Sequence, residues 1–162
     1  MNDSFSLLEA NLNDEDQAAE VLRLLDAFSS DPFGGGHPLS EKVRTKVIDG
    51  LREFPTTRIY LACEGAEAVG FAICFLSYST FRARRILNIK DYFVPHTHRG
   101  RSIGRRLMDF VAERARAEDC CLLTLEVQEN NERARAIYAA AGFEQATYVP
   151  EAGGALYMHK PL

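Results

Sequence analysis

The chain has 162 residues, 46% apolar and 26% charged, and its 23 acidic residues outnumber 19 basic ones for a net charge of −4. This composition is that of a globular domain and excludes a disordered chain, a collagen-like repeat and a disulfide-stabilised miniprotein. The longest apolar run, residues 71–76, is far shorter than the roughly 20 residues that span a bilayer, and the acidic N-terminus lacks the basic region of a secretory signal. We expect one cytoplasmic domain over residues 1–162.

The N-terminal half alternates between strand and helix patterns. Alternation over residues 4–9 predicts a strand, and Asn13 or Asp14 is then placed to cap a helix. That helix carries apolar residues at helical spacing: Ala18, Val21, Leu22, Leu25 and Phe28. A glycine-rich loop follows, and Ser40 caps a second helix that ends before Pro55. The apolar runs 58–63 and 68–77, joined by residues 64–67, predict a β-hairpin.

The C-terminal half continues with a strand over residues 86–94, stopped by Pro95, and a helix whose apolar positions run from 103 to 115. A strand over 121–127 and a short helix over 131–141, ended by Gly142, come next. Residues 143–149 and 155–160 have strand-like patterns. The order β-α-α-β-β-β-α-β-α-β-β predicts an α/β domain with a mixed, largely antiparallel sheet.

The four cysteines lie in apolar stretches or side by side, at Cys63, Cys74, Cys120 and Cys121. They show neither C-x-x-C spacing nor a paired histidine pattern. We therefore expect reduced, interior or half-buried thiols and no metal site.

Positive charge is concentrated in residues 82–116, which hold ten Lys or Arg and only three Asp or Glu. Such a segment suits a nucleic acid, a small polyanionic ligand or a solvated helix face. The acidic whole-chain charge disfavours the nucleic acid. Residues 99–104 form a Gly- and Arg-rich turn before a helix start, where unpaired N–H groups and the helix dipole bind phosphates. The segment has no Walker A loop and no G-x-G-x-x-G motif, which disfavours nucleotide hydrolysis and hydride transfer.

The turn Arg99-Gly100-Arg101-Ser102-Ile103-Gly104 resembles the Arg/Gln-x-x-Gly-x-Gly/Ala acyl-CoA loop of GNAT N-acetyltransferases. Further on, Asn131-x-x-Ala134-x-x-x-Tyr138-x-x-x-Gly142-Phe143 resembles the second signature of that superfamily. The resemblance implies a mixed, mostly antiparallel sheet of six to seven strands flanked by about four helices. It also implies an acetyl-CoA-dependent N-acetyltransferase without a metal. Ser102 stands where the family most often has glycine, and we expect it to cap the helix or to offer its hydroxyl to a phosphate.

The resemblance implies direct attack of an amine on the thioester of acetyl-CoA. A backbone N–H near Phe93 or Val94 would polarise the carbonyl, and Tyr138 would protonate the leaving thiolate, with a packed helix aromatic as the alternative. Asn131 suits either a cofactor contact or a helix N-cap. The implied cofactor-binding residues are Phe93, Val94, Arg99, Gly100, Arg101, Ser102, Ile103, Gly104, Arg105, Asn131, Ala134 and Tyr138.

The general base and the acceptor pocket are less sharply indicated. Glu126 is the first candidate base; Asp91, His96 and His37 are weaker, and a water chain is an alternative. Residues 77–81 and 89–94 resemble polyamine acetyltransferases, but Lys90 replaces their catalytic glutamate, which argues against polyamine specificity. The acceptor pocket is expected from Phe33, His37, Tyr78 and Glu151, with Tyr148 and Tyr157 nearby, for a small-molecule primary amine.

We also expect a homodimer, because the family often dimerises and a sheet edge needs cover. No nucleic-acid or membrane partner is expected. The alternative functions are a non-catalytic acyl-CoA-binding module, acetylation of a protein or peptide amine, and nucleic-acid binding through residues 82–116.

Overall fold

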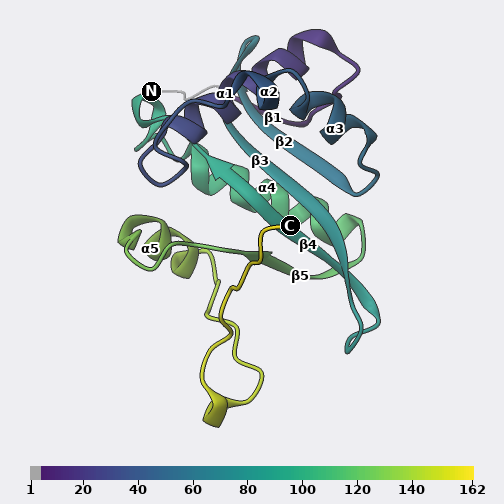
Figure 1. The fold of residues 1–162 in the computed structure, drawn as a ribbon, viewed down its shortest axis with the longest axis vertical. Coiled ribbons are helices and arrows are strands. Elements are labelled where there is room, and N and C mark those ends of the chain that lie inside the picture. Colours follow the sequence, from purple (N-terminus) through teal and green to yellow (C-terminus); the bar gives the residue numbers. More distant parts are fainter. Residues whose placement is uncertain (1–4) are drawn as a thin grey trace. The chain divides into compact units, whose positions relative to one another are not determined.

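The computed structural model describes residues 5–162, and the chain divides into two compact units, residues 1–125 and residues 126–162. The first unit contains a β-sheet covered by helices (Figure 1). The second contains one α-helix and the C-terminal segment. Ser4, part of the first predicted strand, lies outside the described residues.

The sheet of the first unit has five strands in the order β1-β2-β3-β4-β5. The strands are β1 (Ser6–Glu9), β2 (Thr57–Glu64), β3 (Glu67–Ser79), β4 (Arg84–Phe93) and β5 (Cys120–Leu125). The first three pairings are antiparallel, and β4 pairs with β5 in parallel. The mixed, mostly antiparallel α/β fold is confirmed, whereas the prediction of six to seven strands is wrong for the described residues.

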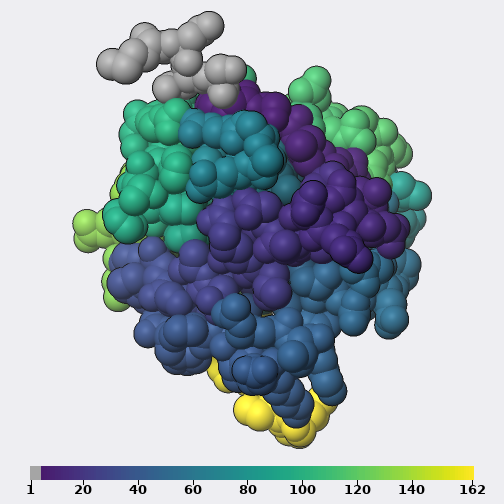
Figure 2. Space-filling model, turned by 90° about the horizontal axis from the view of Figure 1, so that it is seen from above, coloured from purple at the N-terminus to yellow at the C-terminus, as the bar shows by residue number. Residues whose placement is uncertain are grey.

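Two long helices cover opposite faces of this sheet. Helix α1 (Glu15–Ser30) begins at its N-cap Asp14 and packs on the face that carries Ile59, Phe71 and Phe93. Its deeply buried residues include Leu24, which the sequence analysis did not place on the buried face. Helix α4 (Ile103–Ala117) lies on the other face, where the Phe110 ring meets the Tyr60 ring edge-on at 5.8 Å. Figure 2 shows the surface formed by the N-terminal part of the chain, in purple and blue.

The helix predicted after Ser40 is two shorter helices, α2 (Glu41–Arg44) and α3 (Val47–Glu53). The break follows Thr45, whose hydroxyl donates to the carbonyls of Glu41 and Lys42. A threonine hydroxyl that donates to helix carbonyls competes with the backbone N–H groups that would otherwise bond to them and continue the helix. Ser40 caps α2 as predicted, accepting from the N–H of Val43.

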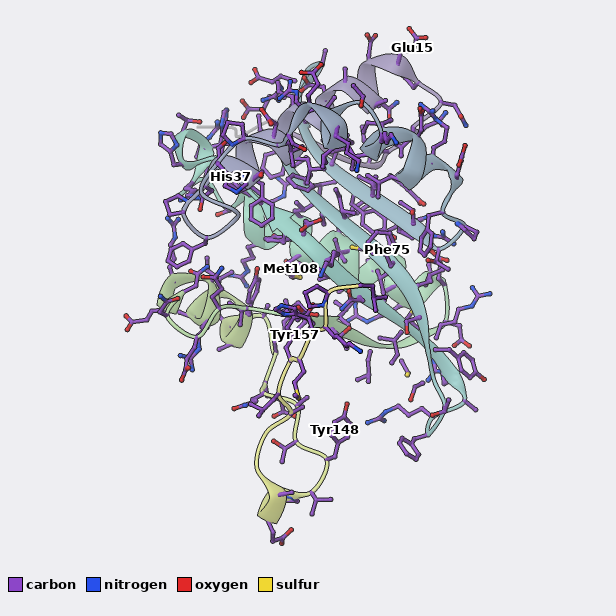
Figure 3. All side chains as sticks on the ribbon, viewed as in Figure 1. Glu15, His37, Phe75, Met108, Tyr148 and Tyr157 are labelled. Carbon is purple, nitrogen blue, oxygen red and sulfur yellow. The ribbon has the colours of Figure 1, made fainter. Side chains whose placement is uncertain are left out.

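The second unit contains α5 (Glu132–Ala140) and a 3-10 turn, Pro150–Ala152. The two strands predicted at residues 143–149 and 155–160 are not formed. A single backbone bond, from Ala155 N to Ala146 O at 2.9 Å, joins these segments. A strand requires a continuous ladder of such bonds, and the described residues supply none here. Figure 3 shows Tyr148 and Tyr157 on this segment.

Cys63, Cys74 and Cys120 are buried and Cys121 is half-buried, all as free thiols. Within residues 5–162, no helix is long and apolar enough to span a membrane.

Candidate active site

The C-terminal end of β4 has an edge without a strand partner. Pairing of β4 with β5 stops at Ile89, which is opposite Leu125. One residue later the pairing with β3 shifts, because Cys74 is opposite Ile89 while Ile73 is opposite Asp91. Lys90 is therefore the extra residue of a β-bulge. Across residues 90–93, the described part of the chain offers no strand to the edge of β4 that faces away from β3.

The turn between β4 and α4 has a backbone that few sequences adopt. Gly100 has φ +82° and Ser102 has φ +59°, both in the left-handed region. Glycine adopts this region without strain, and serine does so at a cost. The expected capping role of the Ser102 side chain is wrong: Ser102 stands at the N-cap position of α4, but its hydroxyl makes no cap hydrogen bond. A left-handed Ser102 does not hold its hydroxyl over the helix N–H groups, so the first turn of α4 keeps unpaired donors.

Tyr92 anchors the first turn of α4 to the sheet. Its hydroxyl donates to the carbonyl of Gly104. A Cβ atom at Gly104 would lie 3.6 Å from the Tyr92 hydroxyl oxygen and 3.8 Å from Val94 Cγ2, which is ordinary van der Waals contact. On β3, a Cβ atom at Gly70 would approach Val94 Cγ2 to 3.2 Å, so this glycine lets Val94 and Ile103 pack closely. Neither Tyr92 nor Gly70 was predicted as a site residue, although Tyr92 stands beside the predicted Phe93 and Val94.

The three arginines of the turn have different surroundings. Arg99 donates to the carbonyl of Val94 and to Asp31. Arg101 forms an ion pair with Glu64 at the end of β2. Arg105 is exposed. In this structure, two of the three predicted phosphate ligands therefore already bind protein carboxylates.

Of the segments predicted to form the acceptor pocket, the glycine-rich segment after α1 contacts the turn that follows β4, through Asp31 and Arg99. Phe33 is 42% exposed, and His37 is exposed on the same segment (Figure 3). The structure does not bring Tyr78 together with them. Tyr78 is opposite Arg85 near the start of β4, whereas Phe71 is opposite Phe93 at its end. Seven residues of strand separate these positions along β3, which is roughly 23 Å at 3.3 Å per residue.

Asp91 is a half-buried carboxylate at the β-bulge. It lies opposite Ile73 in the sheet register, two residues before Phe93. Alternation along the strand therefore places it on the α1 face with those apolar side chains. Burial raises the pKa of Asp91 above its ordinary value, and the neighbouring Lys90 charge opposes that shift. Of the other candidate bases in this unit, His96 is exposed, and His37 Nδ1 lies 3.1 Å from the carbonyl of Pro38.

In the second unit, Asn131 is the N-cap of α5. Its side-chain oxygen accepts from the N–H of Ala134 at 3.2 Å, so the N-cap alternative for Asn131 is observed. Tyr138 is half-buried, and its ring contacts Phe143 edge-on at 5.9 Å. Burial raises the pKa of the Tyr138 phenol. Glu126 and Glu151 are exposed within this unit.

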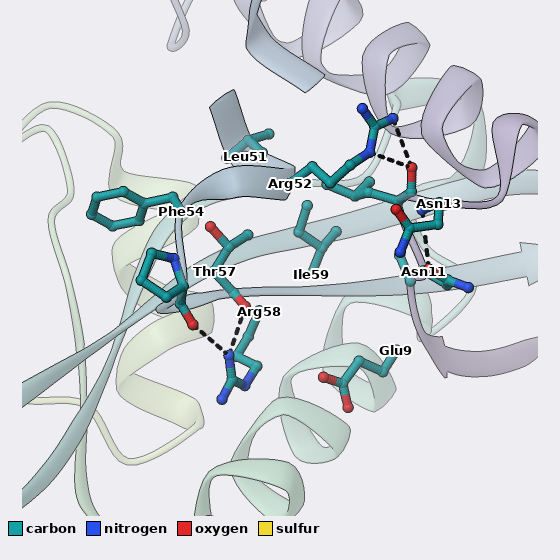
Figure 4. Close-up of a pocket in the computed structure, with 12 residues that line it drawn as sticks. Glu9, Asn11, Asn13, Leu51, Arg52, Phe54, Thr57, Arg58 and Ile59 are labelled. Carbon is teal, nitrogen blue, oxygen red and sulfur yellow. Dashed lines mark hydrogen bonds between the residues drawn. The ribbon is translucent and has the colours of Figure 1, made fainter. Parts of the chain in front are cut away.

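A separate hollow of about 210 Å³ lies where β1, α3 and the start of β2 meet (Figure 4). Leu51, Phe54 and Ile59 contribute apolar walls. Arg52 there donates to the carbonyl of Leu12, and Arg58 to that of Thr57. Thr57 at the start of β2 is opposite Phe75, whereas Phe93 at the end of β4 is opposite Phe71, four residues and roughly 13 Å away along β3. The hollow is not part of the candidate active site.

The site thus combines a helix N-terminus after a glycine turn with a strand end that has no strand partner on one edge. A comparison with protein families agrees with this arrangement. The model of the acetyltransferase (GNAT) family matches residues 21–143. The chain belongs to this family. The match includes both the 99–104 turn and the segment from Asn131 to Phe143, as the resemblance predicted.

Curated relatives of this GNAT chain match over part of its length. It is 36% identical over 84 residues to a thialysine N-epsilon-acetyltransferase of Bos taurus, covering 52% of this chain and 49% of that protein. It is 30% identical over 89 residues to an uncharacterized N-acetyltransferase of Bacillus subtilis, covering 55% of this chain and 60% of that protein. The chain thus matches about half the length of these relatives.

Solved structures share the fold over nearly the whole chain. A probable acetyltransferase has a TM-score of 0.79 at 18% identity and covers 96% of this chain and 99% of its own. A possible acetyltransferase from Clostridium difficile 630 has a TM-score of 0.79 at 17% identity and covers 98% of both chains. At such identities the likeness establishes the fold and not the substrate.

Proposed function

We propose that this chain transfers the acetyl group of acetyl-CoA to a primary amine of a small molecule by direct attack. The observation that carries the proposal is the N-terminus of α4, which the Ser102 side chain does not cap and which follows Gly100 and Ser102 in left-handed conformations. The GNAT family uses acetyl-CoA as its co-substrate, and unpaired N–H groups at a helix start suit its phosphates.

The residues at this turn fit a bound pyrophosphate. A Cβ atom at Gly100 would meet nothing within 4 Å, so there is open space beside the backbone. The first-turn N–H groups of α4 would donate to phosphate oxygens, and Arg105 is exposed on that turn. The positive end of the helix dipole adds to this attraction.

At the strand end, the unpaired edge of β4 supports polarisation of the thioester. A backbone N–H at Phe93 or Val94 would donate to the carbonyl oxygen as negative charge develops on it. The amine nitrogen forms the new bond to the acyl carbon, and the C–S bond breaks. One proton must leave the amine, and one must reach the departing thiolate. Tyr138, matched to the family signature, is proposed to supply the second proton, since a phenol with a raised pKa stays protonated at neutral pH.

The proton of the attacking amine needs an acceptor. Within the first unit, Asp91 is the carboxylate at the end of β4, and its raised pKa makes it a stronger base than an ordinary aspartate. We propose Asp91 for this role, ahead of Glu126, because the β-bulge places Asp91 on the strand whose end offers the oxyanion donors.

The acceptor is proposed to be small and not strongly cationic. The thialysine acetyltransferases among the relatives are named for the ε-nitrogen of an amino acid, which supports a small primary amine. Lys90 is exposed beside Asp91 and would repel a polycation.

Titration calorimetry with acetyl-CoA, ATP and NAD tests the cofactor part of the proposal, with measurable heat expected for acetyl-CoA alone. Thiol release with a panel of amines, including thialysine, then separates an enzyme from a binding module. Tight binding without amine-dependent thiol release would support the non-catalytic module. Equal binding of ATP and acetyl-CoA would contradict the proposed site.

A further inference from the structure

An ion pair between Arg99 and Asp31 joins the two loops that border the end of β4. The Nε of Arg99 donates to the carbonyl of Val94 at 2.9 Å, and its Nη2 donates to Oδ2 of Asp31 at 3.2 Å. The guanidinium carbon lies 5.9 Å from the centroid of the Phe93 ring. The side chains of Arg99 and Asp31 are only 31% and 19% exposed. This pair is therefore better shielded from water than an ordinary surface salt bridge.

Asp31 is also the residue that shapes the loop after α1. Its Oδ1 accepts from the N–H of Phe33 at 3.0 Å. Its carbonyl accepts from Gly34 at 2.8 Å and from Gly36 at 3.2 Å. A Cβ atom at Gly34 would be 1.9 Å from the carbonyl oxygen of Phe28, so only glycine permits this fold of the loop. Residues 33–36 thus depend on Asp31 for their conformation.

The far end of the same loop is fixed separately. Asp26 of α1 accepts from the N–H of Leu39 at 2.9 Å and pairs with Arg44 at 2.7 Å. Ser29 accepts from the N–H groups of Gly35 and His37 through its carbonyl. These anchors are on α1 and α2, whereas Arg99 ties the loop to the end of β4 through Asp31 and Val94.

We infer that Arg99 is a positioning residue that holds the loop of residues 31–37 against the end of β4, and that it serves acceptor binding more than phosphate binding. Its planar guanidinium fixes two acceptors at once, a geometry that lysine cannot reproduce. Phe33 and His37 would thereby be held beside the strand end where the thioester is proposed to lie. The role in acceptor binding rests on the proposed function, whereas the contact between Arg99 and the loop does not depend on it.

The test compares Arg99→Gln and Asp31→Asn, which break the pair from either side, with Arg101→Gln as a matched control for loop exchange alone. Arg101 lies two residues away on the same turn but pairs with Glu64, outside the loop. Amide hydrogen exchange of the peptide covering residues 32–39 measures loop order. Calorimetry measures the Kd of acetyl-CoA, and steady-state rates on the fastest amine of the panel measure kcat and KM.

We expect exchange in residues 32–39 to speed up about tenfold or more in both pair variants and not in Arg101→Gln. In both pair variants, the Kd of acetyl-CoA should stay within about threefold of wild type. The kcat/KM for the acceptor amine should fall roughly 10- to 100-fold because the loop groups are displaced. Unchanged exchange in both pair variants, or a loss of acetyl-CoA affinity in Arg99→Gln with unchanged exchange, would overturn the inference. If wild type binds no acetyl-CoA, the proposed function fails, and the exchange comparison still decides whether Arg99 orders the loop.

Discussion

Phe143 donates its backbone N–H to the carbonyl of Tyr138 at 2.9 Å, and the two rings meet edge-on at an interplanar angle of 60°. Gly142, at φ +91°, donates to Ala139 at 3.0 Å. Together these bonds form a Schellman ending, in which a glycine in the left-handed region closes the helix and an apolar contact covers it. The Gly-Phe pair of the second signature therefore fixes the Tyr138 ring at the end of α5.

Replacing Tyr138 by phenylalanine should remove the proposed proton donor and keep the aromatic ring. The ring contact with Phe143 survives, so the folded state and the affinity for acetyl-CoA should be nearly unchanged. Loss of a general acid typically lowers the rate about 10²- to 10⁴-fold, or roughly 3 to 5 kcal/mol of barrier. Steady-state kinetics should show the loss in kcat more than in the KM for acetyl-CoA. Turnover within about threefold of wild type would mean that Tyr138 only packs.

Gly104 tests whether the start of α4 receives the phosphates. A Cβ atom fits against Tyr92 and Val94 at van der Waals distance, so Gly104→Ala should fold normally and serve as the control. Gly104→Val adds two methyl groups beside the proposed phosphate position and should abolish the rise in Tm that acetyl-CoA causes by mass action. An undiminished shift in the valine variant would place the phosphates elsewhere.

Asp91 carries a prediction about pH as well as rate. Its pKa in the folded protein is raised above the ordinary 3.8, so between 3.8 and the raised value the folded state holds more protons than the unfolded state. Stability therefore falls as pH rises through that window, and the loss persists at neutral pH. Asp91→Asn should raise Tm at pH 7, with the gain shrinking as pH approaches 3.8.

As a general base, Asp91 should also account for most of the amine-dependent rate. The asparagine variant should lose about 10² in kcat/KM and, with it, the acid limb of the pH profile. A variant that is stabilised but fully active would identify Asp91 as a buried charge without a catalytic role.

Lys90 should exclude polyamines. It is exposed at the bulge, next to Asp91, and its charge opposes that of spermine or spermidine. We expect both to be poorer acceptors than a less cationic amine, and Lys90→Glu to raise the kcat/KM for spermine relative to that amine. A wild-type preference for spermine in steady-state rates would rule this out.

The C-terminal segment suggests self-association. Leu156, Tyr157 and Met158 are 85%, 66% and 85% exposed, and apolar side chains gathered in this way usually contact a partner. We expect a homodimer, visible in light scattering at tens of micromolar as twice the chain mass of 18.1 kDa. A particle of one chain mass would contradict it.

The sequence predicted the elements that local rules control. These include the helix that ends after Phe28, the end of the strand before Pro95, and the caps at Ser40 and Asn131. All depend on residues close in the chain, and all are present in the structure. Gly65, at φ +61°, likewise turns β2 into β3 as the hairpin pattern required.

The prediction failed where conformation depends on distant partners. The strand pattern after Phe143 requires a neighbouring strand to complete its hydrogen bonds, and none is present in the described residues. Ser102 has the right side chain for a cap but the wrong backbone, because the turn puts it in the left-handed region. Arg99 matched a phosphate-binding motif, yet no local pattern indicates that Asp31, 68 residues earlier, binds it.

The central claim is tested most directly by following labelled carbon from acetyl-CoA into an amine. The protein is incubated with acetyl-CoA labelled in its acetyl group and with an amine panel that includes thialysine, and mass spectrometry is combined with thiol release. We predict one labelled acetyl group on an amine nitrogen for each thiol released, at a rate that Tyr138→Phe lowers. Thiol release that is equal with and without amine, and no label on any amine, would contradict the account.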